Sequence, residues 1–435
     1  MPKNNDIVQP GNSWRGFKEL EQRWALLGEL HARPFEPVAV PRQFYHFAFL
    51  TDDDERRADR TALETLVKSR GGTPPSVDES FHRSSIGAWD LRWESHTEFT
   101  TYAWGTSSDS GTIFSPAPDF AFDPSGRLIV AAHLSIVSDD VSDAEIERMF
   151  DRNSLCLIEA ERGDALVATD FQVDPTGFTR ILILDKGLGE DRAGTLVRRI
   201  IEIETYRTLA LLGLPPAREA APIVRQTEQE LAVLTGKIRD AEDIETNHAS
   251  LRRLTELAAK IEAQAAETGF RFGASRAYYE IVQARLNVIG EIEVPGRRTF
   301  SGFFARRLAP AISTCNAVEK RQDNLSRKLM RTAELLRTSI QFELEQQNRD
   351  LLASMNRRAR LQLRLQQTIE GLSIAAVSYY AVGLLGYLFK GLVPSTAPVS
   401  PAVLTALSVP LIIGIVWWIL YRARKAFEGR NRTKP

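Results

Sequence analysis

Two long uncharged stretches near the C-terminal end are the clearest feature of the hydrophobic pattern. Residues 371–389 and 391–421 contain no Asp, Glu, Lys or Arg. A helix of ~20 apolar residues is long enough to cross the ~30 Å hydrocarbon core of a bilayer. Three prolines at the start of the second run predict a short loop before its helical part, which begins at about Ala402; they are Pro394, Pro398 and Pro401. The pattern predicts a hairpin of two membrane-spanning helices, and the alternative is a helical hairpin buried in a soluble core.

Basic side chains flank this hairpin at the ends away from the loop. They are Arg357, Arg358, Arg360 and Arg364 before the first run and Arg422, Arg424, Lys425, Arg430, Arg432 and Lys434 after the second. The loop side carries only Lys390. Lys and Arg are enriched on the cytoplasmic side of membrane proteins. We therefore expect the N- and C-termini in the cytoplasm and the loop on the outer side.

The segment before the first span has the pattern of a long helix. Residues 311–370 contain neither Gly nor Pro, which favours an uninterrupted helix. Its apolar positions form a stripe at helical spacing: Leu325, Leu329, Leu336, Ile340, Leu344, Leu351 and Met355. Such a stripe needs a partner, which the helical patterns at 218–268 and 274–289 can supply. The alternatives are an antiparallel bundle within one chain and a homo-oligomer in which stalk helices of several subunits surround an axis.

Residues 1–215 have the mixed pattern of an α+β domain. Short apolar or aromatic runs predict strands and longer amphipathic runs predict helices. The predicted strands are 44–50, 166–173 and 179–184, and the predicted helices are 53–70, 142–153 and 191–212. The expected architecture is a cytoplasmic α+β domain (1–215), a helical bundle with a long stalk helix (216–370), and two transmembrane helices with a basic tail (371–435).

Charge and composition narrow the class of protein. The net charge is −1, from 55 Lys and Arg against 56 Asp and Glu, so we expect no nucleic-acid partner. Residues 1–215 carry 23 basic and 35 acidic residues, and the remainder carries 32 and 21. Only two cysteines occur, which excludes a disulfide framework and a Cys-rich zinc site. Cys156 stands in an apolar run and is interpreted as a packed core thiol.

Two polar clusters in the first 100 residues are the candidate site. The first contains Glu29, His31 and Arg33. The second contains Arg92, Glu94, His96 and Glu98, which would share one face of a strand because side chains alternate along it. A Glu–His–Glu row suits a metal or ligand site, proton transfer, or a polar ladder that fixes strand register, with Arg33 or Arg92 neutralising a carboxylate. A divalent cation is the one cofactor that this set leaves open.

The residues Glu29–Pro34 (ELHARP) and Trp93–Phe99 (WESHTEF), followed by two C-terminal spans, resemble a bacterial family of uncharacterised membrane-anchored proteins. The resemblance covers nearly the whole chain. It implies a multi-pass protein of the bacterial inner membrane, with the lipid bilayer as a partner. It brings no established activity.

The architecture also resembles that of the CorA-type metal-ion transporters. In that superfamily an acidic cytoplasmic α/β domain leads through a long stalk helix into a first span that lines an ion pathway in a pentamer. The Gly-Met-Asn signature that closes that span is absent, and the corresponding stretch begins at Gly383. Small residues on the first span permit close helix packing or line a pore; they are Gly371, Ala375, Ser378 and Gly386.

Three functions are compatible with these patterns. The first is an oligomeric cation transporter, channel or ion sensor of CorA-like build. The second is a membrane-anchored regulatory or scaffold protein whose cytoplasmic domain binds a ligand or partner. The third is an enzyme that uses Glu94, His96, Glu98 and His31. The third has the least support, because the sequence contains no P-loop, no His-Glu-x-x-His and no Gly-x-Ser-x-Gly.

Overall fold

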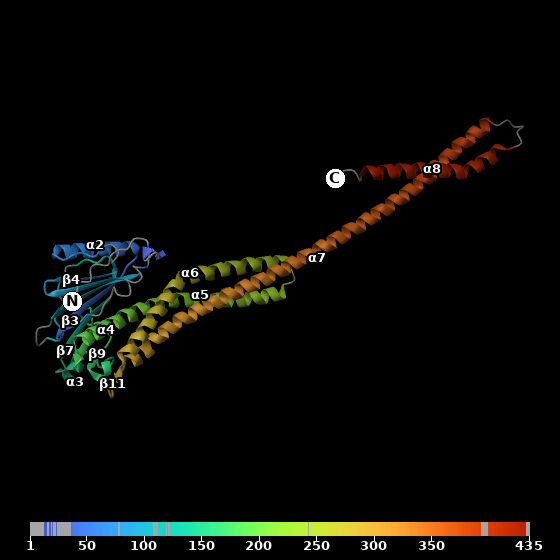
Figure 1. Cartoon of the computed structure of the whole chain (residues 1–435). Helices are drawn as coiled ribbons and strands as arrows, with labels where there is room; N and C mark the ends of the chain where they lie inside the picture. Colours follow the sequence, from blue (N-terminus) through green and yellow to red (C-terminus); the bar gives the residue numbers. More distant parts are fainter. Residues whose placement is uncertain are drawn as a thin grey trace. The chain divides into compact units, whose positions relative to one another are not determined.

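The computed structural model of the chain describes residues 36–76, 79–107, 112–118, 120, 122–138, 140–241, 243–392 and 399–431, together with positions 13, 14, 17, 18, 20 and 23. Contacts divide the chain into two units (Figure 1). The first comprises Met1–Asp240 and Ala249–Ala333, and the second comprises Ala241–His248 and Glu334–Pro435. Each unit is described by itself below.

A nine-stranded mixed sheet forms the centre of the first unit. The strand order is β11-β8-β9-β10-β7-β3-β6-β5-β4, and β10 and β7 run parallel to each other. The strands are β3 (Arg42–Leu50), β4 (Phe81–Ile86), β5 (Trp89–Ser95), β6 (Phe99–Ser107), β7 (Arg127–Ser138), β8 (Cys156–Ala160), β9 (Ala165–Thr169), β10 (Thr179–Asp185) and β11 (Ile292–Glu293). The short strands β1 (Ser13–Trp14) and β2 (Phe17–Lys18) pair separately. The predicted α+β class is confirmed.

Helices cover both faces of this sheet. α2 (Asp53–Ser69) buries Leu63 and Val67 against Tyr45 and Trp93 on one face. α3 (Asp143–Met149) buries Ile146 against strands β8 to β10. α4 (Glu190–Ala210) covers the opposite face, where its apolar side joins a core with β7 to β10. Alternation along each strand therefore supplies two cores, one on each side of the sheet.

The predicted elements of this domain agree with the structure apart from their ends. The predicted strand 166–173 ends at Thr169, and the predicted helix 142–153 ends at Met149. Cys156 is fully buried in the core beneath α4, and burial raises the pKa of its thiol to about 12. The interpretation of Cys156 as a packed thiol is confirmed.

Three helices of the first unit extend from the sheet domain as an antiparallel bundle (Figure 1). They are α5 (Leu214–Asp240), α6 (Ile244–Ile289) and the first part of α7 (Phe300–Leu392). One ion pair joins each pair of helices: Arg253 of α6 with Glu230 of α5, Arg321 of α7 with Glu228 of α5, and Arg276 of α6 with Glu319 of α7. Within this chain the stalk helix therefore packs in an antiparallel bundle, which is the first of the two arrangements that the sequence left open.

One helix crosses the boundary between two predicted helical segments. The predicted segment 218–268 contains most of α5 and the first part of α6, and α6 continues through Gly269 and Gly273 into the predicted segment 274–289. Phe272 lies between these glycines and is fully buried against Ala217 and Val318. Glycine in a helix costs ~1 kcal/mol, and burial of a phenylalanine side chain contributes ~1.5–3 kcal/mol. Burial of Phe272 therefore offsets the cost of the two glycines, which is of similar size.

The second unit contains the part of α7 that begins at Glu334, and the whole of α8 (Pro401–Asn431). α7 runs to Leu392 as one helix, so the expected absence of a break before the apolar run is confirmed. Both helices are long and apolar enough to cross a membrane, which is weak support for membrane association. The predicted apolar stripe on α7 is buried in its first part and exposed further along the helix. Leu336 and Ile340 are buried, whereas Leu351 is 60% exposed.

Candidate functional site

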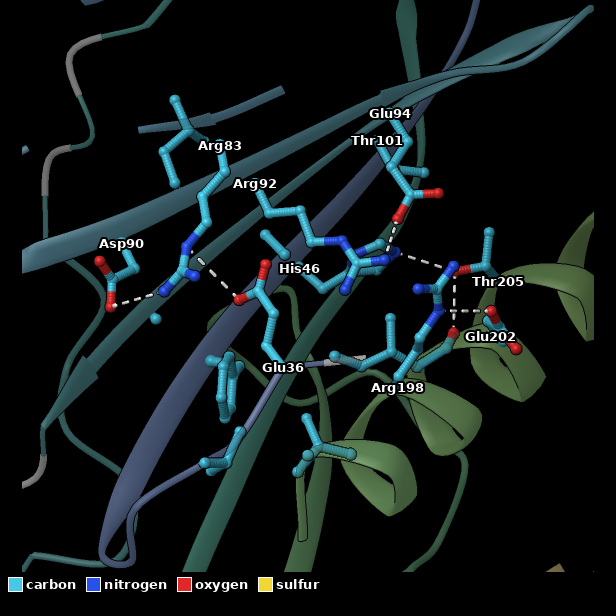
Figure 2. Close-up of a pocket in the computed structure, with 18 of the residues that line it drawn as sticks. Glu36, His46, Arg83, Asp90, Arg92, Glu94, Thr101, Arg198, Glu202 and Thr205 are labelled. Atoms are coloured by element: carbon cyan, nitrogen blue, oxygen red, sulfur yellow. Dashed lines mark hydrogen bonds and ion pairs between the residues drawn. The ribbon is translucent and has the colours of Figure 1, made fainter. Parts of the chain in front are cut away.

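A cavity of about 200 Å³ lies between the sheet and α4, where several of the predicted polar residues meet. It is far larger than the ~10–15 Å³ that a single water needs. Strands β3, β5 and β6 line one side, α4 lines the other, and the segment 36–38 and Arg285 of α6 complete it (Figure 2). It belongs entirely to the first unit.

Small residues on β6 create this space. His46 of β3 and Arg92 of β5 both pair with Ala103 of β6, so the three form one row across the sheet. The neighbouring row places Gly105 between Phe44 and Asp90. A methyl group and a hydrogen atom therefore stand between larger side chains, and the depression that they leave is the floor of the cavity.

Gly194 allows the segment 36–38 to close one side of the cavity. A Cβ atom on Gly194 would lie 1.7 Å from the carbonyl oxygen of Glu36, which is closer than any real contact. The amide of Val38 donates to the carbonyl of Glu190, one turn earlier in α4, at 2.9 Å. The close approach of this segment to α4 therefore requires glycine.

Charge is concentrated around the cavity. Five arginines and four carboxylates line it: Arg42, Arg83, Arg92, Arg198 and Arg285, with Glu36, Asp90, Glu94 and Glu202. Most of them pair with one another, as Arg92 does with Glu94 at 2.5 Å and Arg198 with Glu202 at 3.0 Å (Figure 2). The arginines exceed the carboxylates by one positive charge.

Two of these guanidinium groups keep a buried donor without a partner. Nη2 of Arg42 donates to Asp90, but its Nε has no hydrogen-bond partner. Nη2 of Arg92 donates to Glu94, and its Nε likewise has none. Buried polar groups are nearly always hydrogen-bonded, so two such donors beside a cavity indicate a missing acceptor.

His46 contributes a buried imidazole to the same cavity. It is 4% exposed, and its Nε2 lies 2.8 Å from Oγ1 of Thr205 on α4 (Figure 2). Burial lowers the pKa of His46 to about 4, with a smaller opposing effect from the Glu94 carboxylate. The ring is therefore neutral at pH 7.

Of the predicted strand-face cluster, Arg92, Glu94 and His96 meet at the cavity and Glu98 does not. Arg92 and Glu94 lie on one face of β5, as predicted, while Trp93 is buried on the other. The ring of His96 stacks on Phe99 at 4.2 Å, and its Nε2 lies 3.6 Å from Glu94. The prediction that one strand continues through Glu98 is wrong, because β5 ends at Ser95 and residues 96–98 form a turn.

Glu98 instead attaches this turn to the bundle. Its Oε1 accepts hydrogen bonds from Nη1 of Arg271, at 3.2 Å, and from the hydroxyl of Tyr278, both on α6, and its Oε2 forms an ion pair with Nη2 of Arg271 at 2.8 Å. Burial and this hydrogen bond raise the pKa of Tyr278. These contacts give Glu98 a structural place outside the cavity. Among the described residues no group of three or more His, Cys, Asp or Glu side chains is arranged to hold a metal ion.

The remaining predicted residues lie elsewhere. Glu29, His31 and Arg33 fall outside the described residues. In the second unit, Ser378 is buried and a Cβ on Gly386 would lie 3.4 Å from Cγ2 of Thr405 on α8. Gly371 and Ala375 are exposed.

Sequence reasoning missed most of the cavity, including Arg42, His46 and Arg198. Their segments are far apart in the chain, and only the pairing of β3 with β6 and the packing of α4 bring them together. A local signal existed in β3, where His46 interrupts an aromatic strand. A polar residue at a buried strand position is the kind of exception that indicates a partner or a site.

The fold and the cavity define a class: an α+β domain with an arginine-rich pocket, extended by a helical bundle and ending in two long apolar helices. The chain belongs to the family described as "Protein of unknown function (DUF3422)", which matches residues 18–427. The resemblance to an uncharacterised family is thereby confirmed. No curated protein and no solved structure matches the chain.

Proposed function

We propose that this protein is a membrane-anchored binding protein whose α+β domain holds a small anionic ligand in the cavity beneath α4. The observation that carries the proposal is the pair of buried guanidinium Nε groups of Arg42 and Arg92 that lack an acceptor. Arginine binds carboxylates and phosphates through several donors at once. Each Nε is buried, so an anion in the cavity would satisfy both groups once the two side chains shift to present them to it.

The lining supports a small ligand rather than a nucleotide. Ligand pockets commonly enclose ~300–1,000 Å³, and this cavity has about 200 Å³. Its apolar part comes from Val38, Phe44 and Val197, which would contact a short carbon skeleton.

In this proposal the two apolar helices anchor the domain at the bacterial inner membrane, with both termini in the cytoplasm. The length and composition of α7 and α8 support an anchor, and the basic flanks support the orientation. The cation-transport hypothesis stays a prediction, because a pathway would form only in an oligomer and the structure contains one chain.

The test is thermal unfolding of the detergent-solubilised full-length protein with sodium carboxylates, phosphate and sulfate at constant ionic strength. We expect at least one anion to raise Tm, and Arg92→Gln to weaken its binding by about 10–100-fold, because a hydrogen bond to a charged group is worth ~1.5–3 kcal/mol. The matched control is Arg57→Gln, an arginine that is 73% exposed and distant from the cavity lining. Equal effects of an anion on both variants, or no effect of any anion, would contradict the proposal.

A further inference from the structure

The imidazole of His46 has a hydrogen-bonding position that no described residue fills. Its Nδ1 is buried and has no partner, while its Nε2 faces Thr205. The side chain lines the cavity beside Arg92 (Figure 2). A buried polar atom without a partner costs ~1–3 kcal/mol, which a ligand group of the right kind would recover.

The hydrogen bonds around Thr205 determine what that group must be. The hydroxyl of Thr205 has one proton and lies 2.9 Å from the carbonyl oxygen of Ile201 and 2.8 Å from Nε2 of His46. When this hydroxyl donates to Ile201 it accepts from Nε2, which then carries the ring proton of His46. In a neutral imidazole the other nitrogen is then a bare acceptor. Nδ1 needs a donor, and an anionic oxygen cannot provide one.

The sheet register places Nδ1 of His46, which needs a donor, and Nε of Arg92, which lacks an acceptor, on side chains that flank Ala103. His46 and Arg92 stand in the row whose middle member is Ala103. Neighbouring strands are ~4.8 Å apart, so the backbones of β3 and β5 are ~10 Å apart across that row. A molecule of a few carbon atoms resting on Ala103 spans the gap between the two side chains.

The charge of the lining selects among anions. Five arginines face four carboxylates around the cavity, so these nine groups together carry one positive charge. A carboxylic acid carries one negative charge at pH 7, whereas a phosphate monoester carries about −1.5 to −2. The balance favours a monocarboxylate.

We infer that the ligand is a small hydroxy acid whose carboxylate lies against Arg92 and whose hydroxyl donates to Nδ1 of His46. This inference rests on the proposed function, since it names the ligand class of the same cavity. In this arrangement His46 recognises the hydroxyl of the ligand through a hydrogen bond, and the arginines bind its carboxylate.

The test compares acids that differ only by a hydroxyl. The full-length protein in detergent is titrated calorimetrically with 2-hydroxypropanoate and propanoate, and with 2-hydroxybutanoate, 3-hydroxybutanoate and butanoate. We expect at least one hydroxy acid to bind about 10-fold or more tightly than its parent acid, which corresponds to ~1.4 kcal/mol. Propane-1,2-diol, which has the hydroxyls without the carboxylate, is expected to bind far more weakly.

Two variants test whether His46 is the residue that distinguishes a hydroxy acid from its parent acid. His46→Leu is expected to bind hydroxy acid and parent acid alike while keeping carboxylate affinity. The matched control is His133→Leu, which removes a similarly buried histidine that does not line the cavity and is expected to keep the preference. The wild-type comparison stands even where a variant fails to fold.

The outcomes separate the inference from the proposal beneath it. Carboxylates that bind with equal affinity with and without the hydroxyl overturn the hydroxy-acid inference and leave anion binding intact. A preference for inorganic phosphate over every carboxylate also overturns it. Binding of no anion at all removes the proposed function and the inference together.

Discussion

Glu98 and Arg271 form an ion pair, with 2.8 Å between Oε2 and Nη2, that joins the turn between β5 and β6 to α6. The side chain of Glu98 is 13% exposed, and Tyr278 donates to the same carboxylate. Next to this contact Tyr206 of α4 and Tyr278 of α6 stack at 5.6 Å. The turn that follows the cavity strand is thereby held against two helices of the first unit.

Replacing Glu98 with Gln should therefore lower stability more than ligand affinity. The variant keeps the shape of the side chain but loses the charge that faces Arg271, and a hydrogen bond to a charged group contributes ~1.5–3 kcal/mol. Tm in detergent is the measurement. Glu64→Gln, which removes an exposed pair with Lys68, is the control and should change stability by under ~0.5 kcal/mol. Similar Tm values for the two variants would show that Glu98 is not an anchor.

A second prediction concerns the buried carboxyl of Asp59. It is fully buried on α2, and it accepts hydrogen bonds from Nε1 of Trp93 and the hydroxyl of Tyr102, each at 3.0 Å. Asp59→Ala leaves two buried donors without acceptors, at ~1–3 kcal/mol each. We expect a large loss of Tm, whereas Asp54→Ala at an exposed position of the same helix should have a small effect. The contact also lies behind β5, so near-ultraviolet dichroism of the tryptophans should change.

Much of this arrangement could be predicted from sequence, and the failures have physical causes. The aromatic and apolar run from Phe44 to Leu50 predicts β3 because aromatic side chains fit the surface of a sheet. The alternation from Arg92 to Glu98 also predicts a strand but crosses a turn. The residues at that turn, His96 and Thr97, are not the Gly, Asn or Pro that mark turns. The hairpin is held instead by pairing of β5 with β6 and by contacts with α6.

The cavity could not be predicted, because its key relations are not local. Sequence analysis identified Arg92, Glu94 and His96 but could not place His46 in the same row, since that requires the register of β3 with β6. It also could not place Thr205 of α4 beside Nε2 of His46. Such relations follow from pairing between segments more than 40 residues apart in the chain.

Stability should fall as the pH falls from 6.5 toward 4. Burial lowers the pKa of both His46 and His133 to about 4, below the ordinary value of 6.5. Between these values the unfolded chain binds more protons than the native one, so the free energy of unfolding decreases with decreasing pH, by up to about 3 kcal/mol for each group. Above pH 6.5 both groups contribute fully.

Tm measured from pH 7.5 to 5 provides the test of that dependence. His133→Gln should reduce the pH dependence by removing one of the two groups, even if it lowers Tm at every pH. The exposed carboxylates also titrate in the lower part of this range, so the comparison is between variant and wild type. An unchanged dependence would mean that His133 is not held neutral by burial.

The hairpin of α7 and α8 makes a prediction about facing positions. A Cβ on Gly386 would lie 3.4 Å from Cγ2 of Thr405, whereas a Cβ on Gly383 would meet nothing within 4 Å. Cysteines at 386 and 405 should therefore form a disulfide in lipid vesicles under mild oxidation. Cysteines at 383 and 405 are the matched control and should not. The native Cys156 and Cys315 are buried and should not compete. Equal cross-linking of both pairs would contradict the observed packing of α7 on α8.

The last prediction concerns Gly194, where we expect alanine to destabilise the protein although alanine is favoured over glycine inside helices. Alanine is favoured over glycine inside a helix by ~1 kcal/mol, so Gly236→Ala in α5, where a Cβ would meet nothing, should raise Tm. At Gly194 the same methyl group would lie 1.7 Å from the carbonyl oxygen of Glu36, and the segment 36–38 would have to move away from α4. Overpacking of this kind costs ~1–3 kcal/mol. Gly194→Ala should therefore lower Tm, open that side of the cavity and weaken binding of the carboxylate, all in the same protein in which Gly236→Ala is stabilising. A Gly194→Ala protein as stable as the wild type would show that the segment does not depend on this close approach.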